Sequence, residues 1–170
     1  ITDQSSVKAS FNTLLQYIHM LSNTTSISPT DTWKLSDPSI KPQRGYQVSA
    51  GYYRNFAASN IETSVEVYYK NMKNYLDYKS NAVLLMNHHI ETDVISTKGK
   101  AYGAELMIKK TAGKLNGWLS YTYSRTFLRM DDPLAGESIN NGKYYPASFD
   151  KPHNVNLISN YRFSHRWSAS

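Results

Sequence analysis

Short segments that alternate apolar and polar residues recur along this chain of 170 residues. The clearest is residues 61–70, IETSVEVYYK, in which the odd positions suit an apolar surface and Glu62, Ser64, Glu66 and Lys70 favour water. Successive side chains of a β-strand point to opposite faces, so such a segment has one apolar face and one wet face. The alternation therefore predicts β-strands that each separate an apolar environment from an aqueous one.

The same alternation predicts further strands, joined by two kinds of connection. Strands are expected at about residues 7–18, 46–55, 61–70, 100–110, 118–127 and 153–163, with another beginning at Trp167. Residues 71–98 lack clean alternation and leave a short hairpin and a helix both open. Segments rich in Pro, Ser, Asn and Asp predict long loops at residues 22–44 and 128–152, whereas residues 56–60, 112–117 and 164–166 predict tight turns.

The connections thus alternate between long and short. In an antiparallel meander, this rhythm places every long loop at one end of the sheet and every tight turn at the other. Bacterial outer-membrane barrels show that asymmetry, whereas a soluble sandwich or propeller more often mixes its turn lengths. The sequence therefore predicts an all-β fold, an antiparallel meander that forms part of a transmembrane β-barrel.

The composition is compatible with a barrel and gives no sign of a membrane helix. Hydrophobic residues make up 40% of the chain, and the mean hydropathy is −0.55. No stretch approaches the roughly 18 continuous apolar residues of a membrane helix, but a barrel strand needs only about 10 residues with alternate positions apolar. The 14 tyrosines outnumber the 5 phenylalanines and 3 tryptophans, and such amphipathic rings are favoured at lipid–water interfaces.

Cysteine content and charge exclude several classes of protein. The chain has no cysteine, which excludes a disulfide-stapled domain and Cys-based metal sites. Its net charge is +6, but the basic residues are scattered, so no nucleic-acid partner is expected. Residues 1–6 show no signal-peptide pattern and no initiator Met, and the chain stops where a strand begins at Trp167. We therefore expect a fragment of a longer protein.

One cluster of potential metal ligands lies between the expected strands. His88 and His89 with Glu91 and Asp93 offer imidazole and carboxylate groups that suit zinc or iron. Adjacent residues on a strand point in opposite directions, so the two imidazoles do not easily share one ion. We expect solvated loop side chains here and no metal or cofactor.

The chain also lacks a convincing catalytic arrangement. Glu62 and Glu66 lie roughly 13 Å apart along their strand, which is too far for paired carboxylate catalysis. Ser124, Asp150 and His153 have no nucleophile-elbow context. An enzyme is not expected.

Aromatic residues outside the clear strands are candidates for ligand capture at the mouth of a barrel: Trp33, Tyr75, Tyr78, Tyr144 and Tyr145. Aromatic faces suit sugars, siderophores and peptides alike. The alternative is that these rings belong to interfacial girdles or pack loop on loop. Both interpretations stay open at this point.

Several motifs, taken in their order, resemble one protein family. Residues 99–106, GKAYGAEL, look like the "G.a.G.E" strand of TonB-dependent outer-membrane receptors. The other similar segments are 63–74 (TSVEVYYKNMKN), 113–126 (GKLNGWLSYTYSRT), 145–146 (YP), 150–157 (DKPHNVNL) and 161–163 (YRF). Their wording is closest to receptors of the Bacteroidetes lineage. The resemblance covers most of the chain, and the ordered set is more specific than any single piece.

The resemblance implies a barrel of about 22 strands with a plugged lumen. Residues 1–170 would supply about six to seven of these strands, while the plug, the segment that contacts the TonB energy-transducing complex and the terminal strand lie outside this chain. The polar sides of the strands would line the lumen and contact the plug through Glu62, Glu66, Glu105, Asn154, Asn156 and Arg162. The implied function is active uptake of a nutrient, an iron chelate or a glycan, across the Gram-negative outer membrane. The implied partners are TonB, membrane lipid and a surface lipoprotein.

Two other functions remain as alternatives. One is a soluble antiparallel β-module that binds carbohydrate in a cleft, and the other is a structural, porin-like surface protein. An open sheet exposes two edges and an apolar face, so the isolated fragment is expected to self-associate.

Overall fold

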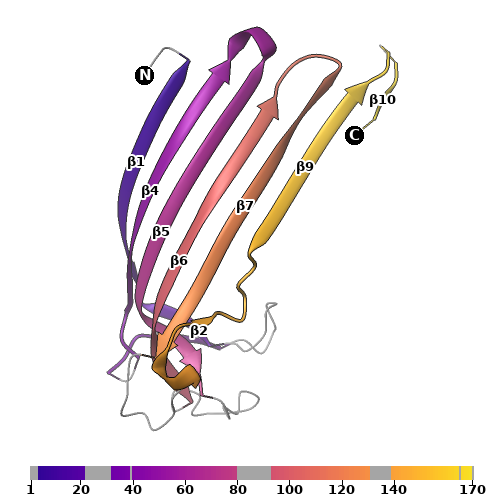
Figure 1. Cartoon of the computed structure of the whole chain (residues 1–170). Helices are drawn as coiled ribbons and strands as arrows, with labels where there is room; N and C mark the ends of the chain where they lie inside the picture. Colours follow the sequence, from indigo (N-terminus) through magenta and orange to yellow (C-terminus); the bar gives the residue numbers. More distant parts are fainter. Residues whose placement is uncertain are drawn as a thin grey trace.

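The main feature of the structure, a computed structural model, is one long antiparallel sheet (Figure 1). The structure describes residues 4–21, 32–38, 40–79, 93–130, 139–164 and 166–169. Neighbouring strands follow in the order β1 (Ser5–Gln16), β4 (Gln43–Phe56), β5 (Ile61–Tyr78), β6 (Val94–Lys110), β7 (Leu115–Met130), β9 (His153–Arg162) and β10 (Ser168–Ala169). β8 (Tyr145–Pro146) pairs with β7, and β2 (Ile18–Leu21) pairs with β3 (Thr32–Leu35) in a second, two-stranded sheet. The predicted all-β meander is confirmed.

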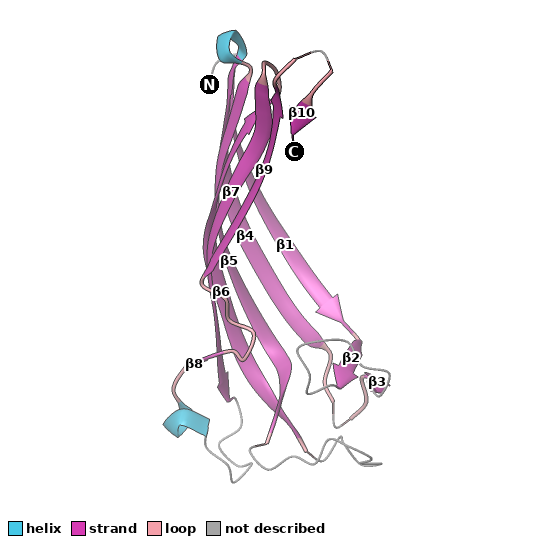
Figure 2. Cartoon of the chain, turned by 90° about the vertical axis from the view of Figure 1, so that its right-hand side faces the viewer, coloured by secondary structure: helices cyan, strands magenta, loops and turns pink. Residues whose placement is uncertain are grey.

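The two ends of the sheet differ as the loop rhythm predicted. Short connections join β4 to β5, through the 3₁₀ turn η1 (Ala57–Ser59), and β6 to β7. The strand ends that the long connections join lie at the opposite end, with β2, β3, β8 and the 3₁₀ turn η3 (Ile139–Gly142) (Figures 1 and 2). Among the described residues, no helix is long and apolar enough to cross a membrane.

The pattern left residues 71–98 open, and the described parts of this segment, residues 71–79 and 93–98, extend two strands. β5 continues to Tyr78 and β6 begins at Val94. The register between them shifts between Met72 and Tyr75, where Asn74 has a φ of 56°. A β-bulge of this kind changes which face the following residues point to, and this explains why the alternation breaks there.

The expectation of an unbroken first strand and a plain loop at residues 22–44 is wrong in part. β1 ends at Gln16, β2 follows after Tyr17, and β3 lies inside the expected loop and pairs with β2. Leu21 and Ile40 are buried together, with Leu76 and Val94 packed against them. This small core attaches the β2–β3 unit to β5 and β6 at the long-loop end of the sheet. The segments in contact are far apart in the sequence, so the periodicity of residues along the chain could not indicate this contact.

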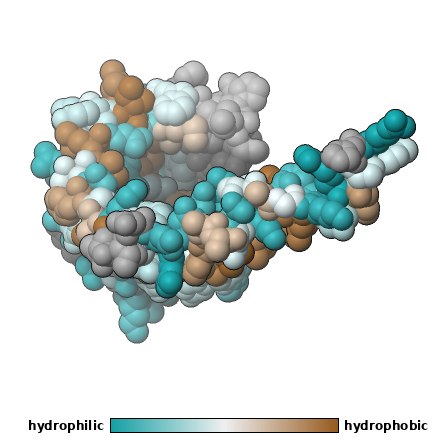
Figure 3. All heavy atoms as spheres, turned by 90° about the horizontal axis from the view of Figure 1, so that it is seen from above, coloured by the Kyte–Doolittle hydropathy of each residue, from teal (hydrophilic) through white to brown (hydrophobic). Residues whose placement is uncertain are grey.

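The registers of five strand pairs align rows of apolar positions on one face. One row across the sheet reads Val7, Tyr52, Val65, Leu106, Tyr121 and Val155. The next row, on the other face, reads Lys8, Gly51, Glu66, Glu105, Thr122 and Asn154. The apolar face is uncovered, since Val7 and Val155 are 58% and 63% exposed. Figure 3 shows the curved wall from above, with hydrophobic side chains along one side of its extended arm. The sheet does not close into a ring within the described residues.

Gly117 is required for the pairing of β7 with β9. Its φ is +152°, and a Cβ there would lie 2.1 Å from the Ile158 carbonyl oxygen. We expect Gly117→Ala to lower the free energy of unfolding of the lipid-embedded protein by about 3 kcal/mol, because both strain and a backbone clash arise. The control, Gly142→Ala, has a φ of +69° but no atom within 4 Å, so it should cost about 1 kcal/mol. Equal losses in denaturant titrations would contradict this assignment.

Candidate functional site

The polar face of the sheet carries every polar residue that the sequence singled out for a lumen. Glu66 lies opposite Glu105, and Glu62 lies opposite Lys109. Asn154 and Asn156 pair with Thr122 and Ser120. Arg162 continues the same side of β9, two residues after Asn160 and six after Asn156. These residues share the face opposite the apolar rows; that the face encloses a lumen stays a prediction.

Glu66 and Glu105 form a directly opposed carboxylate pair near the middle of this face. Residues opposite each other in an antiparallel pair have Cβ atoms about 4.5–5.5 Å apart, and like charges there are destabilising. The Tyr53 hydroxyl and the Glu66 side chain both lie beside Gly51. Gly51 makes this approach possible, since a Cβ there would lie 2.9 Å from the Tyr53 hydroxyl and 3.1 Å from Glu66 Cγ. Within the described part of the chain, no Lys or Arg forms an ion pair with either carboxylate.

Glu62, four residues along the same strand, has a different environment. Its carboxylate lies 3.5 Å from the Lys109 ammonium, and both side chains are nearly half exposed. Such exposed pairs contribute little to stability. Glu62 is therefore electrically compensated, whereas the Glu66–Glu105 pair is not.

A hollow of about 450 Å³ lies on the polar face near the long-loop end. Its lining combines amide, imidazole and ammonium groups with thioether and aromatic ones: Gln16, His19, Gln43, Lys70, Met72, Tyr75 and Phe149 are among them. The Tyr75 and Phe149 rings lie 6.3 Å apart and are tilted. Sequence reasoning identified only Tyr75 here. The other residues come from separate strands and connections, so no local pattern indicated them.

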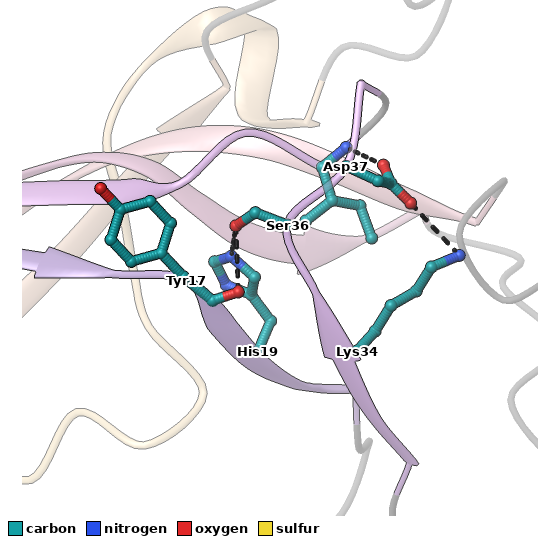
Figure 4. A network of polar contacts seen from close by, with 6 residues as sticks. Tyr17, His19, Lys34, Ser36 and Asp37 are labelled. Carbon is teal, nitrogen blue, oxygen red and sulfur yellow. Dashed lines mark hydrogen bonds and ion pairs between the residues drawn. The ribbon is translucent and has the colours of Figure 1, made fainter.

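His19 and Met20 of β2 line one side of this hollow, and polar contacts fix the β2–β3 unit to which they belong (Figure 4). The buried His19 ring places Nε2 3.1 Å from Ser36 Oγ, and Ser36 Oγ donates to the Tyr17 carbonyl at 3.1 Å. Asp37 accepts a hydrogen bond from the Ile40 amide at 2.7 Å and lies 3.6 Å from the Lys34 ammonium. Burial lowers the pKa of His19 from its ordinary 6.5, so the folded unit favours the neutral ring.

The candidate aromatic residues do not form one cluster. Tyr145 donates a hydrogen bond of 2.6 Å to Asp77 Oδ2, and burial together with this bond raises the pKa of Tyr145. Tyr75 lines the hollow, whereas Trp33 is 64% exposed on β3 and Tyr78 is half-buried at the end of β5. The Tyr144 ring lies against Lys100 and Arg129, whose β-strand positions belong to the apolar face. Their role in ligand capture stays a prediction.

The groups considered for catalysis are engaged separately. Ser124 Oγ donates to the Lys151 carbonyl, and Asp150 accepts from Arg125 Nε at 2.9 Å and from the Thr126 amide at 2.7 Å. His153 Nδ1 lies 2.8 Å from the Tyr121 hydroxyl. The motif at residues 150–153 thus fixes the start of β9 against β7.

Most of the potential metal ligands lie outside the described residues. His88, His89 and Glu91 lie outside the described residues, and Asp93 is their nearest described neighbour. Among the residues that the structure does describe, no group of three or more His, Asp or Glu could hold a metal ion. The expectation of no metal site remains a prediction.

The Tyr145–Asp77 bond should hold the Tyr145–Pro146 segment on β7. We expect Tyr145→Phe to raise hydrogen exchange at the Ala147 amide, which donates to the Thr126 carbonyl, by about tenfold or more, because a charge-assisted bond of about 1.5–3 kcal/mol is lost. The matched control is Tyr144→Phe, which keeps its ring over Lys100. The assignment fails if both variants exchange at the same rate.

The β2–β3 unit should loosen in acid. The folded pKa of His19 is below 6.5, so the opened state binds the proton first and closure loses stability as the pH falls below about 6.5. Hydrogen exchange in β2 should therefore rise between about pH 7 and pH 5. In His19→Gln, which does not titrate, this pH dependence should vanish; its persistence would show that another group is responsible.

The family model described as "TonB dependent receptor-like, beta-barrel" matches residues 1–170. Comparisons with curated proteins and with solved structures gave no match. The members of this family are transporters and receptors of the Gram-negative outer membrane rather than enzymes, and they interact with TonB. The two-faced antiparallel meander and this match over its full length show that the chain belongs to the β-barrel domain of the TonB-dependent receptors.

Proposed function

We propose that this chain forms part of the barrel wall of a TonB-dependent active transporter that takes up a nutrient, an iron chelate or a glycan, in a bacterium of the Bacteroidetes lineage. The observation that carries the proposal is the division of the sheet into an uncovered apolar face and a polar face with an uncompensated carboxylate pair. The first face suits lipid, and the second suits a basic partner inside the barrel.

The apolar face supports a position in the bilayer. Hydrocarbon offers no partners for backbone N–H and C=O groups, so every strand must be paired on both sides. The described strands meet this condition except along the outer edge of β1 and along the part of β9 that lies beyond its short pairing with β10. We therefore propose that strands of the same receptor flank these edges and complete a ring of about 22 strands. The chain alone would instead pair its edges with other copies.

The Glu66–Glu105 pair supports contact with a plug. Two opposed carboxylates that form no ion pair with a described Lys or Arg favour a basic side chain supplied from the lumen. A plug that presents Arg or Lys at this height would relieve the repulsion and would be held in place. When TonB pulls on the plug, this contact is one that must break before ligand passes.

The hollow near the long-loop end supports a role in ligand capture. Its volume of about 450 Å³ is in the range of small-molecule sites, and its mixed lining offers aromatic faces beside amide and ammonium donors. Tyr75 would contact ligand, and Tyr145 would hold the adjacent connection on β7 through Asp77. A surface lipoprotein that closes over the long loops fits this arrangement. No cofactor is involved.

The test uses the whole receptor with Glu66→Gln and Glu105→Gln combined. Loss of both charges removes the attraction for a basic plug residue, so protease cleavage of the plug should rise about tenfold or more. Uptake should be measured with a panel of iron chelates and oligosaccharides in energised and in uncoupled cells. In energised cells that carry the double variant, uptake should fall toward the level of uncoupled cells.

The control is Glu62→Gln, since Glu62 already lies beside Lys109 and is exposed. It should leave plug cleavage and uptake close to the unmodified protein. If the double variant behaves like this control, the carboxylate pair does not hold the plug. A receptor that is monomeric and folded without detergent would overturn the transporter assignment and favour a soluble binding module.

A further inference from the structure

The apolar face ends in a belt of basic residues at the long-loop end. Arg44 lies opposite Lys73, and Lys98 lies opposite Arg129, with all four at positions that continue the apolar rows. Lys100 and Arg125 lie on the same face, nearer the middle of β6 and β7. The described strand residues of these rows include no Asp or Glu, and Asp150, which reaches the belt from the connection before β9, is bound to Arg125.

The Arg44–Lys73 end of the belt borders a groove of about 540 Å³. Phe11, Leu15 and Tyr46 supply its apolar wall, and the Phe11 and Tyr46 rings stack with centroids 6.4 Å apart. Like charges in directly opposed positions are destabilising unless an anion lies between them. Neither Arg44 nor Lys73 forms an ion pair within the described part of the chain. The groove thus joins a cationic end to an apolar channel.

The other end of the belt is organised around an aromatic ring. Lys100 Nζ lies 4.1 Å from the centre of the Tyr144 ring, and Arg129 Cζ lies 5.2 Å from it. The face of an aromatic ring attracts cations. Tyr144 therefore holds two positive groups close together, and neither has a carboxylate partner among the described residues.

We propose that this belt binds the phosphate headgroups of an anionic lipid of the outer leaflet, with an acyl chain lying along the groove beside Phe11 and Tyr46. Arg and Lys bind phosphate through charge-assisted hydrogen bonds, and basic clusters at membrane depth recognise anionic headgroups. This inference rests on the proposed function, because the long-loop end then faces the cell exterior and the apolar face meets lipid.

Position in the fold favours a lipid over a dissolved anion. The belt continues the uncovered apolar rows and lies on the face opposite the carboxylate pair and the hollow, so a ligand in the lumen does not reach it. A phosphate with an attached acyl chain would bind the cationic end of the groove and cover its apolar wall at the same time. A free phosphate would leave Phe11, at 65% exposure, and Leu15, at 49%, uncovered.

The experiment places the whole receptor in phosphatidylcholine nanodiscs that contain a minority of phosphatidylglycerol, and it counts retained lipids by native mass spectrometry. The unmodified protein should retain phosphatidylglycerol in preference to phosphatidylcholine. Arg44→Gln with Lys73→Gln, and separately Lys100→Gln with Arg129→Gln, should lower this preference about fivefold for each cation removed. The preference should also weaken as salt rises.

The matched control is Arg54→Gln. Arg54 continues the same face at the tight-turn end and lies over the Phe56 ring at 4.7 Å, so it tests charge and cation–π contact without the belt. It should retain the preference. Equal loss in this control, or no loss in the belt variants, overturns the site. Displacement of the lipid by inorganic phosphate at the same phosphate concentration would overturn the lipid assignment.

The outcomes separate this inference from the proposed function. A receptor that stays out of the bilayer overturns the transporter assignment and this site with it. A receptor that inserts and transports, but retains both lipids equally, overturns the site alone. Circular dichroism of each variant checks that the strands remain folded.

Discussion

The strand register is the constraint on which the rest of this structure depends. In an antiparallel sheet, a slip of one residue moves every side chain of a strand to the other face. Here the registers keep Val7, Tyr52, Val65 and Leu106 in one row and Glu66 beside Glu105 in the next. A slipped strand would place carboxylates in lipid and valines in water. The apolar environment on one side therefore fixes the pairing, and the pairing brings the polar groups together.

The chemistry of each face follows from this division. On the polar face, the strands hold two carboxylates without a counter-ion, which gives the wall an attraction for a basic partner. On the apolar face, positive charge gathers at the long-loop end, beside Tyr46 and Tyr144. Both arrangements leave charge that the described part of the chain does not neutralise. The sheet therefore has unneutralised negative charge on one face and unneutralised positive charge on the other, and each favours contact with a molecule of opposite charge.

Local sequence was a good guide wherever alternation was regular. The strands through Val65, Leu106, Tyr121 and Leu157 form as expected, because the period of two follows directly from the pleat. The prediction from local sequence failed at Asn74, where one bulge shifts the register. It also failed at β3, whose pairing with β2 depends on the buried contact of Leu21 with Ile40. The hollow beside His19 was also not predictable, because its lining comes from separate strands and connections.

The sequence by itself determined the two-sided strands, the alternation of loop lengths and, through ordered motifs, the family. These depend on neighbours along the chain, whose side chains point in directions that the strand geometry sets. Only the tertiary structure decided that Glu66 opposes Glu105, that Arg44 opposes Lys73 and that Tyr144 and Tyr145 serve opposite faces. Those relations depend on which residues of different strands are paired, and pairing is a property of the assembled sheet rather than of any one segment.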